Sequence, residues 1–148
     1  ALLDLGGNIK VIGTKPSGRP WHIALRHPDD TDKTAGTLSV SDTSIVTSGD
    51  YERYFIENGR RYHHIFDPHT GQPVQNGLRA VTVICKDSEK ADILSTALFV
   101  MGEKKAALFW KEHRGEFQMI LFRNDNTLMI TPDLQKIFTS ELPVVLIS

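Results

Sequence analysis

Asp92 and Thr96 are four residues apart in a segment with a helical pattern, which places a carboxylate and a hydroxyl on one helix face near its start. Both groups are oxygen donors of the kind that Mg²⁺ prefers, and Mg²⁺ usually keeps positions open for phosphate oxygens and water. A helix start also attracts phosphate. The alternative is a solvated acid and a hydroxyl bonded to its own backbone. The spacing alone does not decide between the two.

Two histidines follow each other at His63 and His64, in a segment with the pattern of a strand. Successive strand side chains point to opposite faces, so the two imidazoles do not readily share one metal and at most one faces a site. A histidine beside a stiff Asp-Pro turn is a candidate general base, because its ordinary pKa of about 6.5 lets it accept a proton near neutrality. The alternative is a strand histidine hydrogen-bonded to a neighbour. The remaining histidines are scattered, and we expect surface or structural roles for them: His22, His27, His69 and His113.

Short glycine motifs occur at Gly6-Gly7-Asn8 and at Ser48-Gly49-Asp50. Each permits either the close approach of a nucleotide to the backbone or simply a tight turn, and two glycines do not separate these interpretations. The sequence contains no Walker loop, no Gly-x-Gly-x-x-Gly fingerprint and no Gly-x-Ser-x-Gly elbow.

Composition excludes several classes of function. The 148 residues carry 17 basic and 18 acidic side chains, a net charge of -1, which gives no electrostatic basis for binding nucleic acid or an anionic membrane. Cys85 is the only cysteine, so neither a disulfide framework nor a multi-cysteine zinc site is available. No segment approaches the ~20 apolar residues of a membrane span, and no signal segment opens the chain. Residues 1–5 are typical of a strand inside a domain, and we therefore expect a trimmed chain.

The elements that must position these residues are mostly strands. Apolar runs predict strands at 2–5, expected to be buried, and at 9–12, 21–25, 38–40, 44–47 and 80–85, with a turn at 15–18 and a surface loop over 27–36. Aromatic and aliphatic residues at 51–65 flank Asn58-Gly59, a dipeptide suited to a two-residue hairpin turn. Tyr51, Tyr54 and Phe55 are expected to pack in the core or across this hairpin.

Helical signals begin at Asp87 or Ser88, either of which suits an N-cap, and stop at Gly102. An inward stripe is expected at Ile93, Leu94, Ala97, Leu98 and Met101. A second helix is predicted over 103–113, a strand pair at 117–122 and 127–130, and a helical turn near 132–138. The chain therefore reads as one α+β domain over 1–148, with a mainly antiparallel sheet and two or three helices packed against it.

Four ordered blocks together resemble the FAD:protein FMN transferases of the ApbE family, once described as thiamine biosynthesis lipoproteins. The blocks are Leu-Asp-Leu-Gly-Gly-Asn at 3–8, Thr-Ser-Gly-Asp-Tyr-Glu-Arg-Tyr-Phe at 47–55, His-His-Ile-Phe-Asp-Pro-His-Thr-Gly at 63–71 and Ala-Asp-Ile-Leu-Ser-Thr-Ala-Leu at 91–98. The last two blocks are the most specific, and the resemblance covers nearly the whole chain. It implies the C-terminal portion of a T-fold-like ApbE domain, without the upstream segment that supplies much of the flavin pocket and a further metal contact.

The resemblance also implies roles for single residues. His64 matches the catalytic histidine, Asp92 and Thr96 match the Mg²⁺ ligands, and Ser95 lies close to the same ion. Phe66 matches a position that touches FAD, where an aliphatic residue is more usual. The resemblance further places a set of residues at the bound nucleotide or in the pocket wall: Gly6, Gly7, Asn8, Ser48 and Gly49. One of the aromatic residues at 51–55 could line the flavin pocket.

The implied activity is Mg²⁺-dependent transfer of FMN from FAD to a Thr or Ser hydroxyl of a target protein, with release of AMP. Two alternatives stay open: an FAD pyrophosphatase that yields FMN and AMP, and a flavin-binding or structural module without turnover. The implied target is a subunit of a membrane redox complex or a reductase. The implied location of the full-length protein is the periplasm, as an inner-membrane lipoprotein.

Overall fold

A seven-stranded sheet forms the centre of the computed structural model, which describes all residues from 1 to 148. Its strands, in spatial order, are β1 (Leu2–Asp4), β2 (Asn8–Val11), β5 (Thr43–Gly49), β8 (Leu78–Cys85), β9 (Gln118–Arg123), β10 (Leu128–Ile130) and β12 (Val144–Leu146). Every neighbouring pair is antiparallel except β10 and β12, which are parallel. The predicted mainly antiparallel sheet is confirmed.

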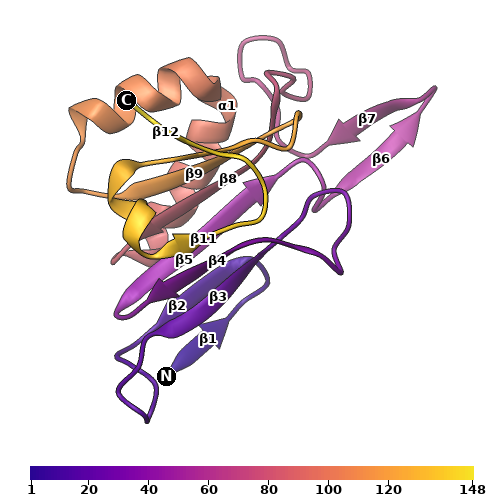
Figure 1. Ribbon diagram of the computed structural model, residues 1–148. Helices are drawn as coiled ribbons and strands as arrows, with labels where there is room; N and C mark the ends of the chain where they lie inside the picture. The colour runs from indigo at the N-terminus through magenta and orange to yellow at the C-terminus, as the bar shows by residue number, and fades with distance from the viewer.

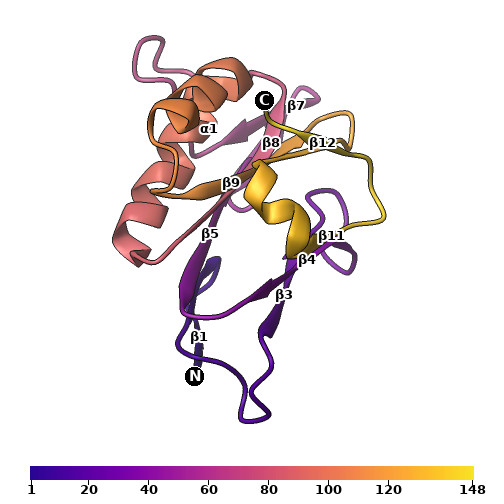
Figure 2. The same cartoon turned by 60° about the vertical axis from the view of Figure 1, so that its left-hand side comes forward.

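Two further layers cover this sheet (Figures 1 and 2). Helix α1 (Ser88–Glu112) packs on one face. A three-stranded sheet of β3 (Trp21–Arg26), β4 (Thr34–Val40) and β11 (Phe138–Thr139) covers the other, with the short 3₁₀ helix η1 (Pro132–Lys136) nearby. The core is accordingly split in two. Val81 and Val83 of β8 face the helix layer, whereas Ala80 and Ile84 face the second sheet. Burial on both faces explains why this strand reads as a continuous apolar run.

Helix α1 begins where the sequence predicted. The Asp87 carboxylate accepts hydrogen bonds from the backbone N–H groups of Glu89 and Lys90, as an N-cap does. Gly102 interrupts the helix with φ 77° and ψ 170°, so the two predicted helices form one element with a kink between them. The predicted inward stripe is wrong at Ile93, whose side chain is 63% exposed. The buried face uses the smaller residues Ala91 and Ser95, which allow the helix start to lie close to β5.

Paired serines hold the start of α1 against β5. Ser44 and Ser88 lie 2.8 Å apart through their hydroxyl oxygens, and Ser48 and Ser95 are joined in the same way at 2.8 Å. Four strand residues span about 13 Å and seven helical residues about 11 Å, so both pairs form when the helix runs alongside the strand. The serine pairs therefore set the position of the helix start relative to the end of β5.

Strand β6 (Tyr54–Glu57) and strand β7 (Arg60–His63) form a separate hairpin that projects from the body of the molecule (Figure 1). Asn58 and Gly59 both have positive φ, 51° and 74°, as a two-residue type I′ turn requires. The predicted hairpin is confirmed, although Tyr51 lies in the loop before it.

Other expectations need correction. Strand β1 is not buried: Leu2 and Leu3 are 38% and 53% exposed, because β1 is an edge strand with a neighbour on one side only. The loop predicted over 27–36 ends earlier, since β4 already starts at Thr34. Strands β11 and β12 were not predicted. No helix in the structure is both long enough and apolar enough to cross a membrane.

Candidate active site

Three hydroxyl groups meet where the end of β5 faces the start of α1. The Ser48 Oγ lies 2.8 Å from the Ser95 Oγ and 3.1 Å from the Thr96 Oγ1. The Ser95 hydroxyl donates to the Asp92 backbone carbonyl at 3.0 Å, and its side chain is fully buried. Thr96 and Asp92 are exposed, and the Asp92 carboxylate has no hydrogen-bond or ion-pair partner in the chain. The structure thus brings Ser48, Ser95 and Thr96 together and leaves the Asp92 carboxylate open one turn earlier.

This donor set suits a hard cation that is shared with a phosphate ligand. It consists of one carboxylate and neighbouring hydroxyls, all oxygen atoms, as Mg²⁺ prefers. No group of three or more His, Cys, Asp or Glu side chains is arranged to hold a metal anywhere in the chain. A closed protein cage is therefore not what these residues form. They match a site in which a bound diphosphate and water supply most of the ligands.

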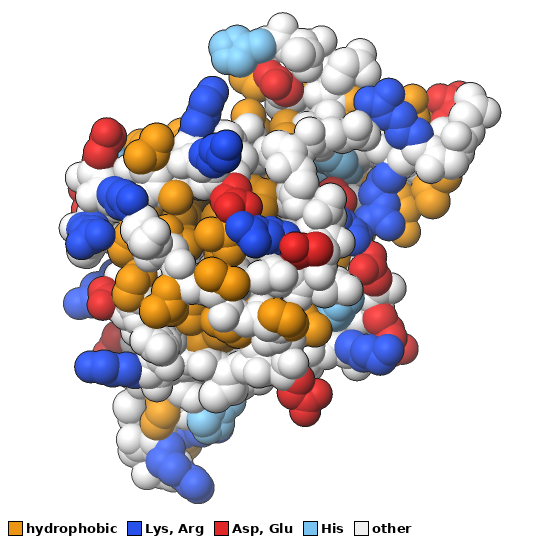
Figure 3. Space-filling model, turned by 45° about the horizontal axis from the view of Figure 1, so that its top comes forward, with side chains coloured by type: hydrophobic (Ala, Val, Ile, Leu, Met, Phe, Trp, Pro, Cys, Tyr) orange, Lys and Arg blue, Asp and Glu red, His pale blue; other side chains and the backbone are white.

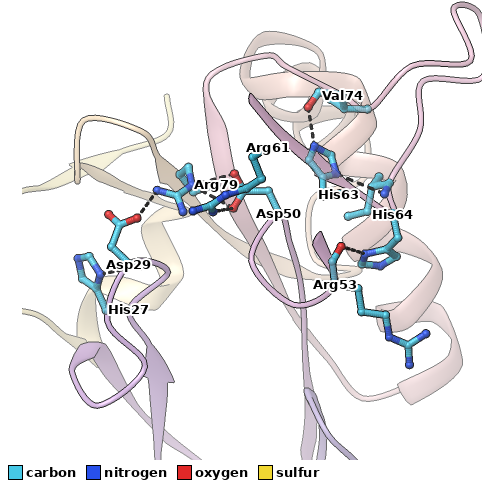
Figure 4. A network of polar contacts seen from close by, with 10 residues as sticks. His27, Asp29, Asp50, Arg53, Arg61, His63, His64, Val74 and Arg79 are labelled. Atoms are coloured by element: carbon cyan, nitrogen blue, oxygen red, sulfur yellow. Dashed lines mark hydrogen bonds and ion pairs between the residues drawn. The ribbon is translucent and has the colours of Figure 1, made fainter. Parts of the chain in front are cut away.

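His63 and His64 point to opposite sides, as the strand pattern predicted (Figure 4). His63 is buried, its Nε2 lies 2.8 Å from the Val74 carbonyl, and its Nδ1 accepts the Ile65 N–H at 3.3 Å. Because Nδ1 accepts, Nε2 carries the proton and donates to Val74. His63 is therefore a neutral structural residue.

His64 is exposed and has a different environment. Its backbone N–H donates to the Arg53 carbonyl at 3.2 Å, and its Nδ1 lies 3.4 Å from the same oxygen. A carbonyl only accepts, so this contact favours the tautomer with the proton on Nδ1. That tautomer leaves Nε2 unprotonated and without a partner, which is the form a general base needs.

A cleft of about 720 Å³ opens on the other face of β5, between the β1–β2 edge and strand β3. Gly6 and Gly7 line it, whereas Asn8, Ser48, Gly49 and Phe66 do not. Thr47 lines the cleft and Ser48 faces the helix, because neighbouring strand residues point to opposite faces. The predicted site residues are thus distributed around the end of β5 and do not share one cavity.

Two of the predicted residues outside the cleft have structural surroundings of their own. Gly49 is covered by the Tyr51 ring: a Cβ at this position would lie 2.5 Å from the Tyr51 Cε1 atom, so only glycine fits. Phe66 is 54% exposed and forms an isolated bridge with Pro73. Both lie in the segments that the family motifs cover.

Tyr51, Glu52 and Arg53 also line the cleft, and sequence reasoning did not select Glu52 or Arg53. Partial burial raises the pKa of the Glu52 carboxyl, although the nearby positive charges of His64, Arg53 and Arg26 act in the opposite direction. Burial also raises the pKa of Tyr51 to about 12. Their position in the sequence could have indicated this role, because these residues form the short loop that joins the end of β5 to the hairpin.

An ionic cluster fixes this loop to the body of the molecule (Figure 4). The Arg79 Nε donates to both carboxylate oxygens of Asp50, at 3.0 and 2.8 Å, and its Nη1 lies 2.6 Å from Asp29. Arg61 of β7 reaches the same Asp50 carboxylate at 3.4 Å. The Arg79 hydrogen bond lowers the pKa of Asp29. Asp50 therefore connects β8 to the root of the hairpin, next to the loop that carries Arg53.

The fold is an α+β architecture that places hydroxyls and a carboxylate at a helix start and leaves the His64 Nε2 without a partner on the hairpin segment. The chain belongs to the ApbE family, whose model matches residues 1–121.

Relatives named FAD:protein FMN transferase include those of Klebsiella pneumoniae, 38% identical over 89% of this chain, and Treponema pallidum, 40% identical over 82%. The chain spans 40% and 36% of their lengths. Among solved structures, the ApbE protein of Thermotoga maritima has a TM-score of 0.83 at 33% identity, covering 93% of this chain and 44% of that one. The apo flavinyl transferase ApbE of Pseudomonas stutzeri has a TM-score of 0.67 at 33% identity, covering 96% and 40%.

Proposed function

We propose that this chain forms the C-terminal part of an FAD:protein FMN transferase, which moves FMN from FAD to a Thr or Ser hydroxyl of a target protein and releases AMP. The observation that carries the proposal is the group formed by Ser48, Ser95, Thr96 and the free Asp92 carboxylate at the start of α1. The names of the relatives support flavin transfer as the kind of reaction.

Asp92 and Thr96, with Ser95 behind them, would hold Mg²⁺. When bound, Mg²⁺ supplies charge neutralisation at the diphosphate of FAD. Ser48 supports this arrangement from β5, because its hydroxyl contacts both Ser95 and Thr96 and so fixes the Thr96 side chain. The start of α1 adds a favourable field for the phosphates.

His64 accepts the proton of the acceptor hydroxyl at its free Nε2. The acceptor oxygen then attacks the phosphorus of the FMN half, the bond to the AMP phosphate oxygen breaks, and AMP leaves with the electron pair. The Arg53 carbonyl holds the imidazole at Nδ1 and so leaves Nε2 as the nitrogen that can accept the proton. The resemblance further suggests a redox-complex subunit or a reductase as the acceptor and a periplasmic lipoprotein as the full-length form.

A single substitution tests the proposed function in the full-length protein. Asp92→Asn should abolish Mg²⁺-dependent transfer, read as loss of a fluorescent flavin band on the acceptor in a denaturing gel. Glu89→Gln, which changes another acid in the first turn of α1, is the matched control and should keep transfer. Transfer that Asp92→Asn leaves intact at limiting Mg²⁺ would contradict the metal assignment. FMN and AMP released without a labelled protein would show hydrolysis instead.

A further inference from the structure

The β6–β7 hairpin has two faces, because side chains alternate along each strand. Phe55 pairs with Tyr62 in the register of the hairpin. The Arg53 carbonyl accepts the His64 N–H, so Arg53 lies opposite His64. This pair is two positions along the hairpin from the Phe55–Tyr62 pair. Alternation therefore places these four side chains, together with Arg60, on a single face. We call this surface the His64 face.

The opposite face anchors the hairpin. His63 is buried against the body of the molecule and bonded to the Val74 carbonyl. Arg61 reaches Asp50 and lies 4.4 Å from the centre of the Tyr54 ring. These contacts fix the hairpin by one side, which leaves the His64 face turned outward.

The His64 face has two stacked aromatic rings at its centre and basic side chains at both ends. The Phe55 and Tyr62 rings stack with centroids 5.1 Å apart and planes 9° apart, and Phe55 is 61% exposed. The Arg60 guanidinium lies 5.3 Å from the Tyr62 centroid. Glu57 lies opposite Arg60 on the same face, so Arg53, Arg60 and Glu57 together leave this face with a net positive charge. Figure 3 shows basic, hydrophobic and acidic side chains together on this projecting part of the molecule.

We propose that the His64 face is the docking surface for the acceptor segment of the target protein, an extended apolar stretch with acidic residues around its Thr or Ser. This inference depends on the proposed function of His64. Phe55 lies two residues beyond the Arg53–His64 pair, about 7 Å along the strand. A segment lying on the stacked rings therefore brings a hydroxyl a few residues away to the His64 imidazole.

The positive face and its aromatic rings match an acidic, apolar partner, and both outer edges of the two-stranded hairpin lack a neighbouring strand. Free strand edges are a common place for extended segments to bind, since the backbone pairs there and the side chains set specificity. The hairpin therefore brings together a free strand edge, an aromatic surface and the candidate general base His64.

The test measures peptide binding to the full-length protein by fluorescence anisotropy. Two labelled peptides carry a central threonine between leucines, one flanked by aspartates and the other by lysines. The wild type should bind the aspartate peptide more tightly. Phe55→Ser should weaken this binding about tenfold, and Arg60→Glu should shift the preference to the lysine peptide. Ile56→Ser, which removes a 63% exposed apolar residue from the opposite face, should bind as the wild type does.

Three results would overturn the docking surface. If Ile56→Ser weakened peptide binding as much as Phe55→Ser, the peptide would not be recognised by the His64 face in particular. A loss of FAD affinity in Phe55→Ser as large as its loss of peptide affinity would mean that the rings serve flavin. A fall in melting temperature for Phe55→Ser alone would mean that the rings pack against the rest of the full-length protein. Peptide binding without flavin transfer to any acceptor would instead contradict the proposed function and leave the docking surface standing.

Discussion

The histidines show how two identical neighbours acquire separate roles. His63 is buried and uses both ring nitrogens in hydrogen bonds, which leaves none for chemistry. His64 uses one nitrogen on the Arg53 carbonyl and keeps the other free at an exposed position. The strand pattern predicted that only one of them could face a site, and the hydrogen bonds identify which one.

His64→Ala should lower the rate of flavin transfer by about 10²- to 10⁴-fold, the usual contribution of a general base, without weakening FAD binding. Transfer kinetics with varied acceptor and varied FAD measure both effects in the full-length protein. His69→Ala, in the exposed loop that follows, is the control and should behave as the wild type. An unchanged rate for His64→Ala between pH 6 and pH 9 would exclude the base role.

Glu52 is a partly buried carboxyl group that lines the cleft. A carbon placed on Gly7 would lie 3.1 Å from the Glu52 Oε1 atom, so the carboxylate lies directly over the glycine turn. Desolvation raises the pKa of this carboxyl above its ordinary 4.5. The folded state therefore holds the proton more tightly than the unfolded state, and stability falls as pH rises through the raised pKa.

Glu52→Gln should therefore increase stability at neutral pH, and the gain should shrink as pH falls through the raised pKa and vanish below 4.5, where the wild-type carboxyl is protonated in both states. Urea unfolding at several pH values measures this difference. Glu57→Gln, an exposed acid at the tip of the hairpin, is the control and should show no such trend. A gain for Glu52→Gln that does not vary with pH would exclude desolvation as its cause.

Among the elements, helix α1 depends most on one residue. Gly102 adopts φ 77° and ψ 170°, a conformation that is essentially restricted to glycine. The Asn76 side chain fills the kink: its Nδ2 donates to the Phe99 carbonyl at 2.7 Å, so a helical oxygen freed by the break keeps a partner. The helix therefore continues beyond the break as a second segment that ends at Glu112.

Gly102→Ala should cost about 1–3 kcal/mol of unfolding free energy, because the new methyl group meets both an unfavourable φ and Asn76. Its Cβ would lie 3.2 Å from the Asn76 Nδ2. Denaturant titration gives the value. Lys105→Ala, at an exposed position of the same helix, is the control and should stay within about 0.5 kcal/mol of the wild type. An unchanged unfolding free energy in Gly102→Ala would mean that the kink straightens at no cost in stability.

In the whole molecule, Arg79 joins parts that are distant in the sequence. It connects Asp50, at the root of the hairpin, with Asp29, in the loop between β3 and β4 of the second sheet. Both Arg79 and Asp50 have largely buried side chains, 15% and 14% exposed. A buried charge that loses its partner is costly, so the cluster resists separation of the two sheets at this end.

Arg79→Met should destabilise the protein by about 3 kcal/mol, because it leaves the Asp50 carboxylate buried with only the longer Arg61 contact. Since Arg79 lowers the pKa of Asp29, part of this loss should disappear as pH falls below the ordinary Asp29 value of 3.8 and through the lowered pKa. Thermal and urea unfolding at several pH values measure the loss of stability and its dependence on pH. Arg123→Met breaks the more exposed pair with Glu103 and should cost at most about 1 kcal/mol. An equal loss of stability in Arg79→Met and Arg123→Met would rule out burial as the reason for the larger effect at Arg79.

Features that depend on near neighbours in the chain were determined by the sequence itself. The Asn58-Gly59 turn, the Asp87 cap and the break at Gly102 each follow from what one or two residues permit in the backbone, and the structure confirms all three. The α+β class and the mainly antiparallel sheet follow from the alternation of short apolar runs and turns. The motif blocks identified the family because their order along the chain is itself sequence information.

Features that depend on competition for burial were decided only by the tertiary structure. Ser48 meets Ser95 across 47 residues, Ile93 points outward because the short Ser and Ala side chains bring the helix start close to β5, and β1 is exposed because it has one neighbour. Glu52 lies at the cleft because β5 ends beside the glycine turn. Local patterns record which faces are apolar but not which faces meet, since that choice is made by the packing of the whole chain.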